Sequence, residues 1–194
     1  MKRYSALLRT GRVLVMTVLA AALTGSGWVT AIDTSDLAGN SDARAGAALA
    51  VTALREDVGS VSDAGTVTLL YGLPGDLSLA DSRWFHQDTP GMVGSAETGD
   101  GFGYDLASGD FDGDGYPDLA IGVPFRDVGT VWNAGGIHVL FGSPDGLSTP
   151  GNRWLDQSLP GVHGSAEPGD WYGYALAAGD FNGDGRDDLA VGVL

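Results

Sequence analysis

The feature that most constrains the fold of this 194-residue chain is an internal repeat. The segment DFDGDGYPDLAIGV at 110–123 recurs 70 residues later as DFNGDGRDDLAVGV at 180–193. Aligned without a gap, residues 57–124 and 127–194 are identical at more than half of their positions. A repeat of this length is one supersecondary unit that cannot bury its apolar face alone, so similar units must pack side by side.

Within one repeat, apolar runs and turn residues predict β-strands rather than helices. The predicted strands cover residues 102–110, 119–124, 135–142 and 152–157. No segment of ten or more residues beyond the N-terminal region has a convincing helical period, and the 32 glycines favour tight turns between short strands. Four strands in about 70 residues suit a β-propeller blade with long loops. We therefore expect an all-β, incomplete propeller of about two blades: three strands of one blade, four of the next and two of a third.

The net charge limits which classes of partner the chain can bind, and the lack of cysteine limits how it can be stabilised. The formal net charge is -15 at pH 7, which disfavours nucleic acid and anionic membranes and favours cations. The chain has no cysteine, so stability must come from packing or from bound metal rather than from disulfides.

The N-terminal 31 residues have the pattern of a secretory signal peptide. Basic residues precede the apolar run VLVMTVLAAAL at 13–23, and small residues suited to cleavage follow at Val29–Ala31. The alternative, a membrane anchor, needs about 20 apolar residues, and this run is shorter. We expect a secreted, extracellular chain that starts near Ile32 and has no membrane span after cleavage. Residues 32–44 are interpreted as a linker or a degenerate repeat start, and 45–194 as the propeller segment.

The repeated acidic segments predict two cation sites. In the first aspartate loop, residues 110–118, side-chain oxygens fall at Asp110, Asp112, Asp114 and Asp118, and the backbone carbonyl of Tyr116 can add a ligand. Two carboxylates about 5 Å apart repel by roughly 3 kcal/mol at an effective dielectric constant near 20, so a divalent ion among them would hold the loop together. All-oxygen ligands in a flexible loop favour calcium over magnesium.

The second aspartate loop, residues 180–188, repeats this spacing with one change. Its ligands would be Asp180, Asn182, Asp184 and Asp188 with the carbonyl of Arg186. Asparagine keeps an oxygen ligand and removes a charge. Neither loop is an EF-hand, because the position where an EF-hand has glutamate is Ile121 in the first loop. A solvated acidic turn is the alternative interpretation of both loops.

The repeat resembles the FG-GAP family. Phe102-Gly103, the aspartate loop and Gly122-Val123-Pro124 carry the resemblance, which covers about residues 45–194 with a degenerate first unit. Such repeats build the N-terminal β-propeller of integrin α subunits, and similar ones occur in glycosylphosphatidylinositol-specific phospholipase D and in secreted bacterial proteins. The resemblance implies a calcium-binding propeller module for extracellular adhesion or ligand binding.

No constellation of catalytic residues emerges from the sequence. The three histidines, His86, His138 and His163, lie in unlike contexts, and Ser95 and Ser165 lack a nucleophile-elbow motif. Glu97 and Glu167 recur at one repeat position, which favours a structural role. Trp84, Trp154 and Trp171 are interpreted as filling between blades, with sugar stacking as the alternative.

Two hypotheses for the function remain. The first is a non-enzymatic module that binds an extracellular protein or carbohydrate. The second is the non-catalytic propeller part of a secreted hydrolase, of the phospholipase D or esterase type, whose active site is not in this chain. Open blade edges predict self-association, and we interpret the chain as a truncated segment.

Overall fold

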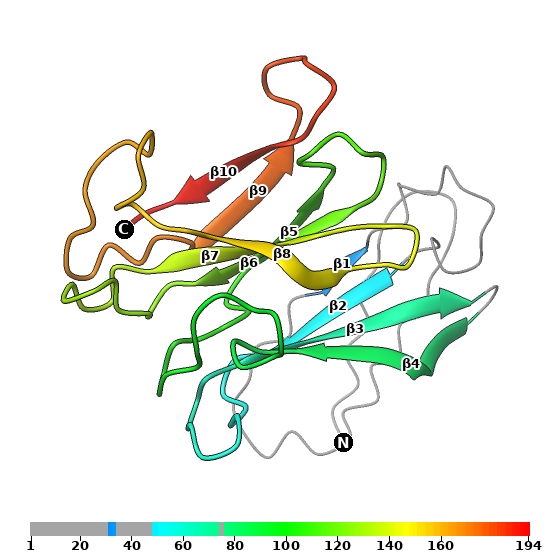
Figure 1. Ribbon diagram of the computed structural model, residues 1–194, viewed down its shortest axis with the longest axis horizontal. Coiled ribbons are helices and arrows are strands. Elements are labelled where there is room, and N and C mark those ends of the chain that lie inside the picture. The colour runs from blue at the N-terminus through cyan, green and yellow to red at the C-terminus, as the bar shows by residue number, and fades with distance from the viewer. Residues whose placement is uncertain (1–30, 34–47, 74–75) are drawn as a thin grey trace.

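A computed structural model describes residues 31–33, 48–73 and 76–194, and these residues form ten β-strands in three antiparallel sheets (Figure 1). No helix occurs within these described ranges, and consequently none that is long and apolar enough to span a membrane. The first sheet has the order β1-β2-β3-β4 and consists of β1 (Ala31–Asp33), β2 (Ala48–Ala53), β3 (Thr66–Leu73) and β4 (Asp76–Phe85).

The second sheet, with order β5-β6-β7-β8, consists of β5 (Leu106–Gly109), β6 (Asp118–Val123), β7 (Gly136–Phe141) and β8 (Ser148–Leu155). The third sheet pairs β9 (Ala175–Gly179) with β10 (Asp188–Gly192). The predicted all-β class is confirmed, and sheets of four, four and two strands are consistent with an incomplete propeller.

The first strands of the three sheets lie next to one another, β1 against β5 and β5 against β9, and each sheet extends outward from them (Figure 1). The 70-residue repeat is visible in the register. Strand β6 corresponds to β2 residue for residue, and β3 and β7 carry their bulges at equivalent positions, between Leu69 and Tyr71 and between Val139 and Phe141. The repeated sequence therefore folds into repeated sheets.

Strand β6 is buried on both faces and separates the two parts of the core. Its residues Leu119, Ile121 and Val123 belong to a cluster shared with the first sheet, whereas Ala120 belongs to a cluster shared with the third sheet. Alternate residues of a strand point to opposite faces, so one strand can pack against two neighbouring sheets. Burying a large aliphatic side chain contributes about 1.5–3 kcal/mol, which makes β6 a main source of stability.

A turn that we call the Phe-Gly corner, Phe102-Gly103 in one repeat and Tyr172-Gly173 in the next, joins each sheet to the following one. Phe102 has no exposed surface, and its backbone N–H donates to the carbonyl of Ala64, 2.9 Å away. The equivalent Tyr172 donates to Ala134 at the same distance. Gly103 has φ +88, which favours glycine because L-residues with a side chain rarely adopt it. This turn explains why β5 begins at Leu106, so the prediction of a strand from residue 102 was wrong.

Two further expectations about the strands need correction. Strand β8 begins at Ser148 rather than at 152, and it ends at Leu155 because Asp156 starts a turn by accepting the N–H of Ser158. The first sheet has four described strands rather than three, since β1 takes the innermost place, with Ile32 opposite Ala50. Of the predicted signal peptide, only Ala31 falls within the described residues.

Candidate metal centre

The two aspartate loops connect the first two strands of the second and third sheets. The first loop follows β5 and leads into β6, and the second follows β9 and leads into β10. Figure 1 shows both loops projecting from the same end of their sheets. The repeat therefore places two acidic loops at one end of the molecule.

Asp110 organises the first loop by accepting three backbone hydrogen bonds. Its Oδ1 accepts the N–H groups of Gly113 and Asp114 at 2.8 and 3.0 Å, and its Oδ2 accepts that of Gly115 at 2.9 Å. Gly113 and Gly115 have φ +78 and +86, a backbone conformation that non-glycine residues rarely adopt. The glycines thus allow the chain to wrap around a carboxylate.

Asp118 closes the loop from the start of β6, and it is only 1% exposed. Its Oδ2 accepts the N–H of Phe111 at 2.9 Å, and its Oδ1 accepts that of Gly142 at 2.7 Å. Burial raises the pKa of Asp118 to about 6; the two N–H donors oppose this rise, and the charges of Asp112 and Asp114 add to it. A nearby divalent cation would favour the charged form.

Three carboxylates of the first loop lie close enough together to hold one ion. Ligand oxygens of Asp110, Asp112 and Asp118 all lie within 4.8 Å of one another. One of the three carboxylates is buried, one is half-buried and one is exposed, so an ion between them would be open to solvent on one side. An oxygen-only donor set of this kind fits a hard divalent cation.

The second loop repeats these hydrogen bonds. Asp180 accepts the N–H groups of Gly183, Asp184 and Gly185 at 2.7, 3.1 and 2.9 Å, and Asp188 Oδ2 accepts that of Phe181 at 3.0 Å. The pKa of Asp180 is lowered, mainly because the Gly185 N–H stabilises its charged form. The two loops therefore have the same backbone design.

The remaining predicted ligands form hydrogen bonds within their own loops. Asp114 is not one of the three clustered carboxylates, and its Oδ1 accepts the N–H of Tyr116 at 2.9 Å. Asp184 accepts the N–H of Arg186 in the same way. The Nδ2 of Asn182 donates to Asp188 Oδ1 at 3.2 Å. Ligation by Asp114, Asp184 and the two carbonyls stays a prediction.

Sequence reasoning missed the hydrogen bond that Gly142 donates to the first loop from outside it. Gly142, just after β7, donates to Asp118, and a Cβ at Gly142 would collide with the carbonyl oxygen of Pro117. The available signal was the recurrence of glycine at positions 72 and 142, after LLY and VLF. Such a glycine marks a close approach of two backbone segments.

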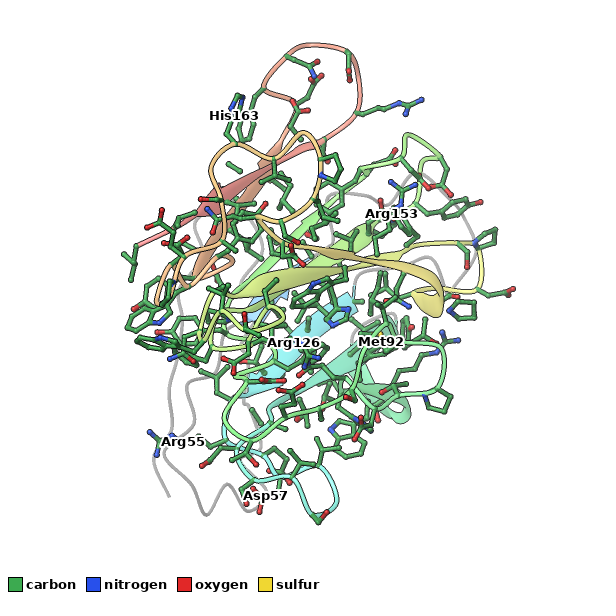
Figure 2. All side chains as sticks on the ribbon, turned by 60° about the vertical axis from the view of Figure 1, so that its left-hand side comes forward. Arg55, Asp57, Met92, Arg126, Arg153 and His163 are labelled. Carbon is green, nitrogen blue, oxygen red and sulfur yellow. The ribbon has the colours of Figure 1, made fainter. Side chains whose placement is uncertain are left out.

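The other polar residues singled out in the sequence have separate surroundings. His138 is fully buried beside the rings of Phe102 and Trp154, and burial lowers its pKa to about 4. His163 is exposed and lies away from Arg126 in Figure 2. Arg126 pairs with Glu97 at 3.2 Å and with Asp100 at 2.8 Å, which gives Glu97 a structural partner.

The tryptophans divide between core and surface. Trp154 packs against the core between the first and second sheets, so the prediction that it fills the space between blades is confirmed. The ring of Trp171 contacts the ring of Phe125. Trp84 is 50% exposed and stands next to His86, with ring centroids 4.6 Å apart. Trp84 therefore does not fill the space between blades, and the prediction was wrong for this residue.

Comparison with known proteins identifies the repeat. The model of the FG-GAP repeat matches residues 102–140 and 172–193. The chain is 38% identical over 91 residues to phosphatidylinositol-glycan-specific phospholipase D of Rattus norvegicus, covering 47% of this chain and 11% of that protein. It is 39% identical over 91 residues to integrin alpha-PS2 of Drosophila melanogaster, covering 47% and 5%.

A longer match, 35% over 112 residues, is to integrin alpha-5 of Xenopus laevis, covering 56% of this chain and 10% of that protein. The chain thus spans about a tenth or less of the length of these relatives. The matched residues include both aspartate loops and the strands around them. The chain is an all-β protein of the propeller type that carries FG-GAP repeats and resembles integrin α chains and phosphatidylinositol-glycan-specific phospholipase D.

Proposed function

We propose that the chain is a calcium-binding, extracellular β-propeller module for adhesion or ligand binding. The observation that carries the proposal is the group formed by Asp110, Asp112 and Asp118, whose ligand oxygens lie within 4.8 Å of one another. Without a cation these carboxylates repel, and the backbone N–H groups around them offset only part of that repulsion.

The donor set favours calcium. It contains oxygen atoms only, and calcium accepts six to eight such ligands in irregular geometry, whereas magnesium requires a compact octahedron. The residues that would hold the two ions are Asp110, Asp112, Asp114, Tyr116, Asp118, Asp180, Asn182, Asp184, Arg186 and Asp188. Tyr116 and Arg186 would contribute backbone carbonyls.

Export to the extracellular space is supported by the sequence of residues 1–31. Basic residues, an apolar run and small residues follow one another in the order of a signal peptide. The mature protein would then begin near Ile32. N-terminal sequencing of protein from culture medium tests this, and recovery of the unprocessed chain in the cytosol alone contradicts it.

The partner would be an extracellular protein or carbohydrate. The net charge of -15 argues against nucleic acid. Self-association is supported by exposed aromatic side chains, since Phe181 and Trp132 are 65% and 58% exposed. Exposed apolar residues are common sites of association.

A second candidate is the non-catalytic propeller part of a secreted hydrolase. It is favoured by the similarity to phosphatidylinositol-glycan-specific phospholipases D of several mammals. We assign no catalytic residue among the described residues. Assaying the product of the full reading frame for phospholipase activity distinguishes the two candidates, since an adhesion module alone would release no product.

Calcium titration tests the proposed function directly. The purified chain is melted in EDTA, in calcium and in magnesium, and its calcium affinity is measured by calorimetry. Calcium should raise the melting temperature because it binds the folded loops and not the unfolded chain. Asp114→Ala should remove part of this effect. A wild-type melting curve that is the same in EDTA and in calcium would refute the proposal.

A further inference from the structure

The two aspartate loops contact each other through a reciprocal pair of hydrogen bonds. The backbone N–H of Asp110 donates to Asp187 Oδ2 at 2.9 Å. The backbone N–H of Asp187 donates to the carbonyl oxygen of Asp110, also at 2.9 Å. The first residue of one loop is thereby joined to the other loop, 77 residues away in the sequence.

The packing around this pair is tight. A Cβ placed on Gly109 would lie 2.8 Å from Cβ and Oδ2 of Asp187. A Cβ placed on Gly113 would lie 2.9 Å from Nε of Arg186. Real Cβ atoms do not approach other atoms this closely, so the two glycines leave the space into which Arg186 and Asp187 fit.

A second carboxylate connects the same two sheets further along β5. Asp105 Oδ2 accepts the N–H of Leu176 at 2.8 Å, and β5 lies against β9. Asp105 precedes β5 and Asp187 contacts the residue that follows it, so the two contacts lie at opposite ends of this strand. The contact of Asp187 with the first loop therefore belongs to a larger contact between neighbouring sheets.

We propose that Asp187 is a positioning residue for the first aspartate loop. It is not one of the expected ligands of the second loop, and it holds the backbone of Asp110, whose carboxylate accepts the three N–H groups around which the first loop folds. The order of the first loop, and hence its affinity for an ion, then depends on the neighbouring repeat. The part of this inference that concerns ions rests on the proposed calcium binding.

We call these two hydrogen bonds the Asp187 latch, and the first loop has no counterpart of Asp187 with which to form one. The equivalent position in the first loop is Pro117, which has neither a backbone N–H nor a carboxylate. The two hydrogen bonds therefore couple the second loop to the first, and Pro117 cannot form the equivalent bonds. If the second loop binds an ion and becomes more rigid, the coupling is reciprocal, and each ion increases the affinity for the other by the same factor.

Amide hydrogen exchange in EDTA tests the latch without any ion. In Asp187→Ala, the N–H of Asp110 loses its acceptor, and we expect its exchange to accelerate at least about fivefold, together with that of Gly113 and Gly115. In Asp187→Asn, the amide oxygen still accepts the bond, so exchange should stay within about twofold of wild type. Glu167→Gln, which changes one exposed carboxylate near the Phe-Gly corner, serves as the charge control.

Calcium titration supplies the second readout. Asp184→Ala disables the second loop and leaves the first to be measured. Adding Asp187→Ala to that protein should weaken the affinity of the first loop about fivefold to tenfold, the usual effect of one hydrogen bond. Adding Asp187→Asn should restore most of the affinity.

The outcomes separate the two proposals. Unchanged exchange at Asp110 in Asp187→Ala, or equal acceleration in Asp187→Ala and Asp187→Asn, overturns the latch. If wild type binds no calcium but exchange responds as expected, the latch stands and the proposed calcium function fails. If calcium binds and Asp187→Ala leaves both exchange and affinity unchanged, the proposed function stands and the latch is wrong.

Discussion

The two aspartate loops share their backbone hydrogen bonds and differ in their surroundings. Asp118 of the first loop is buried and accepts an N–H from Gly142 of its own sheet. Asp188 of the second loop instead accepts the side-chain amide of Asn182 within the loop. The local sequence thus sets the shape of each loop, while neighbouring strands decide how firmly it is held.

The largest difference should appear when the closing aspartate is removed. Asp118→Ala leaves the N–H groups of Phe111 and Gly142 without their acceptor, and we expect a loss of about 2–3 kcal/mol in the free energy of unfolding. Asp188→Ala should cost less than about 1 kcal/mol, because water can replace the two lost hydrogen bonds near the surface. Urea denaturation in EDTA measures both. Equal losses would contradict the difference in support.

The third position of the loops should set their relative calcium affinity. Asp112 gives the first loop four side-chain carboxylates, and Asn182 gives the second three. Since ligand charge raises calcium affinity, the Asp184→Ala protein, which keeps the first loop, should bind more tightly than Asp114→Ala, which keeps the second.

Exchanging the two residues sharpens this prediction. Asp112→Asn should weaken the first loop about tenfold, and Asn182→Asp should strengthen the second by a similar factor. Calorimetric titration of each variant is the measurement. If Asn182→Asp leaves the second loop unchanged, exposure and packing outweigh ligand charge.

Acid should weaken the first loop through Asp118. Burial raises its pKa to about 6, so near pH 5 most of this carboxyl is protonated and cannot bind an ion. We expect the calcium affinity of the Asp184→Ala protein to fall about tenfold from pH 7 to pH 5. Asp114→Ala should lose less, since the pKa of Asp180 in the second loop is lowered.

In EDTA, where no calcium is bound, protonation of the Asp118 carboxyl should stabilise the fold rather than weaken it. The folded state holds the proton of Asp118 more tightly than the unfolded state, for which the ordinary pKa is 3.8. The contribution of Asp118 to stability is therefore largest below pH 4 and is lost as the pH rises through about 6. Melting temperatures of wild type and Asp118→Asn between pH 4 and 7 test this sign.

The sequence was sufficient to predict what is local and repeated. The spacing of Asp110, Asp112 and Asp118 and the glycines between them predicted a folded acidic loop, because the hydrogen bonds within the loop join residues a few positions apart. Strand β1 could not be predicted, since three residues have no measurable period and its pairing with β2 depends on tertiary packing. The contact between Asp187 and Asp110 links distant residues, and no local pattern indicates it.

The smallest expected effect concerns the second residue of each loop. Phe111 packs against the core between the second and third sheets, whereas Phe181 is 65% exposed. Phe111→Ala should therefore lower the free energy of unfolding by about 1–2 kcal/mol, and Phe181→Ala should change it by less than about 0.5 kcal/mol. Urea denaturation of the purified variants measures both changes at one protein concentration. A loss at Phe181 as large as that at Phe111 would mean that Phe181 is covered in solution, and its dependence on protein concentration would then identify self-association through the third sheet.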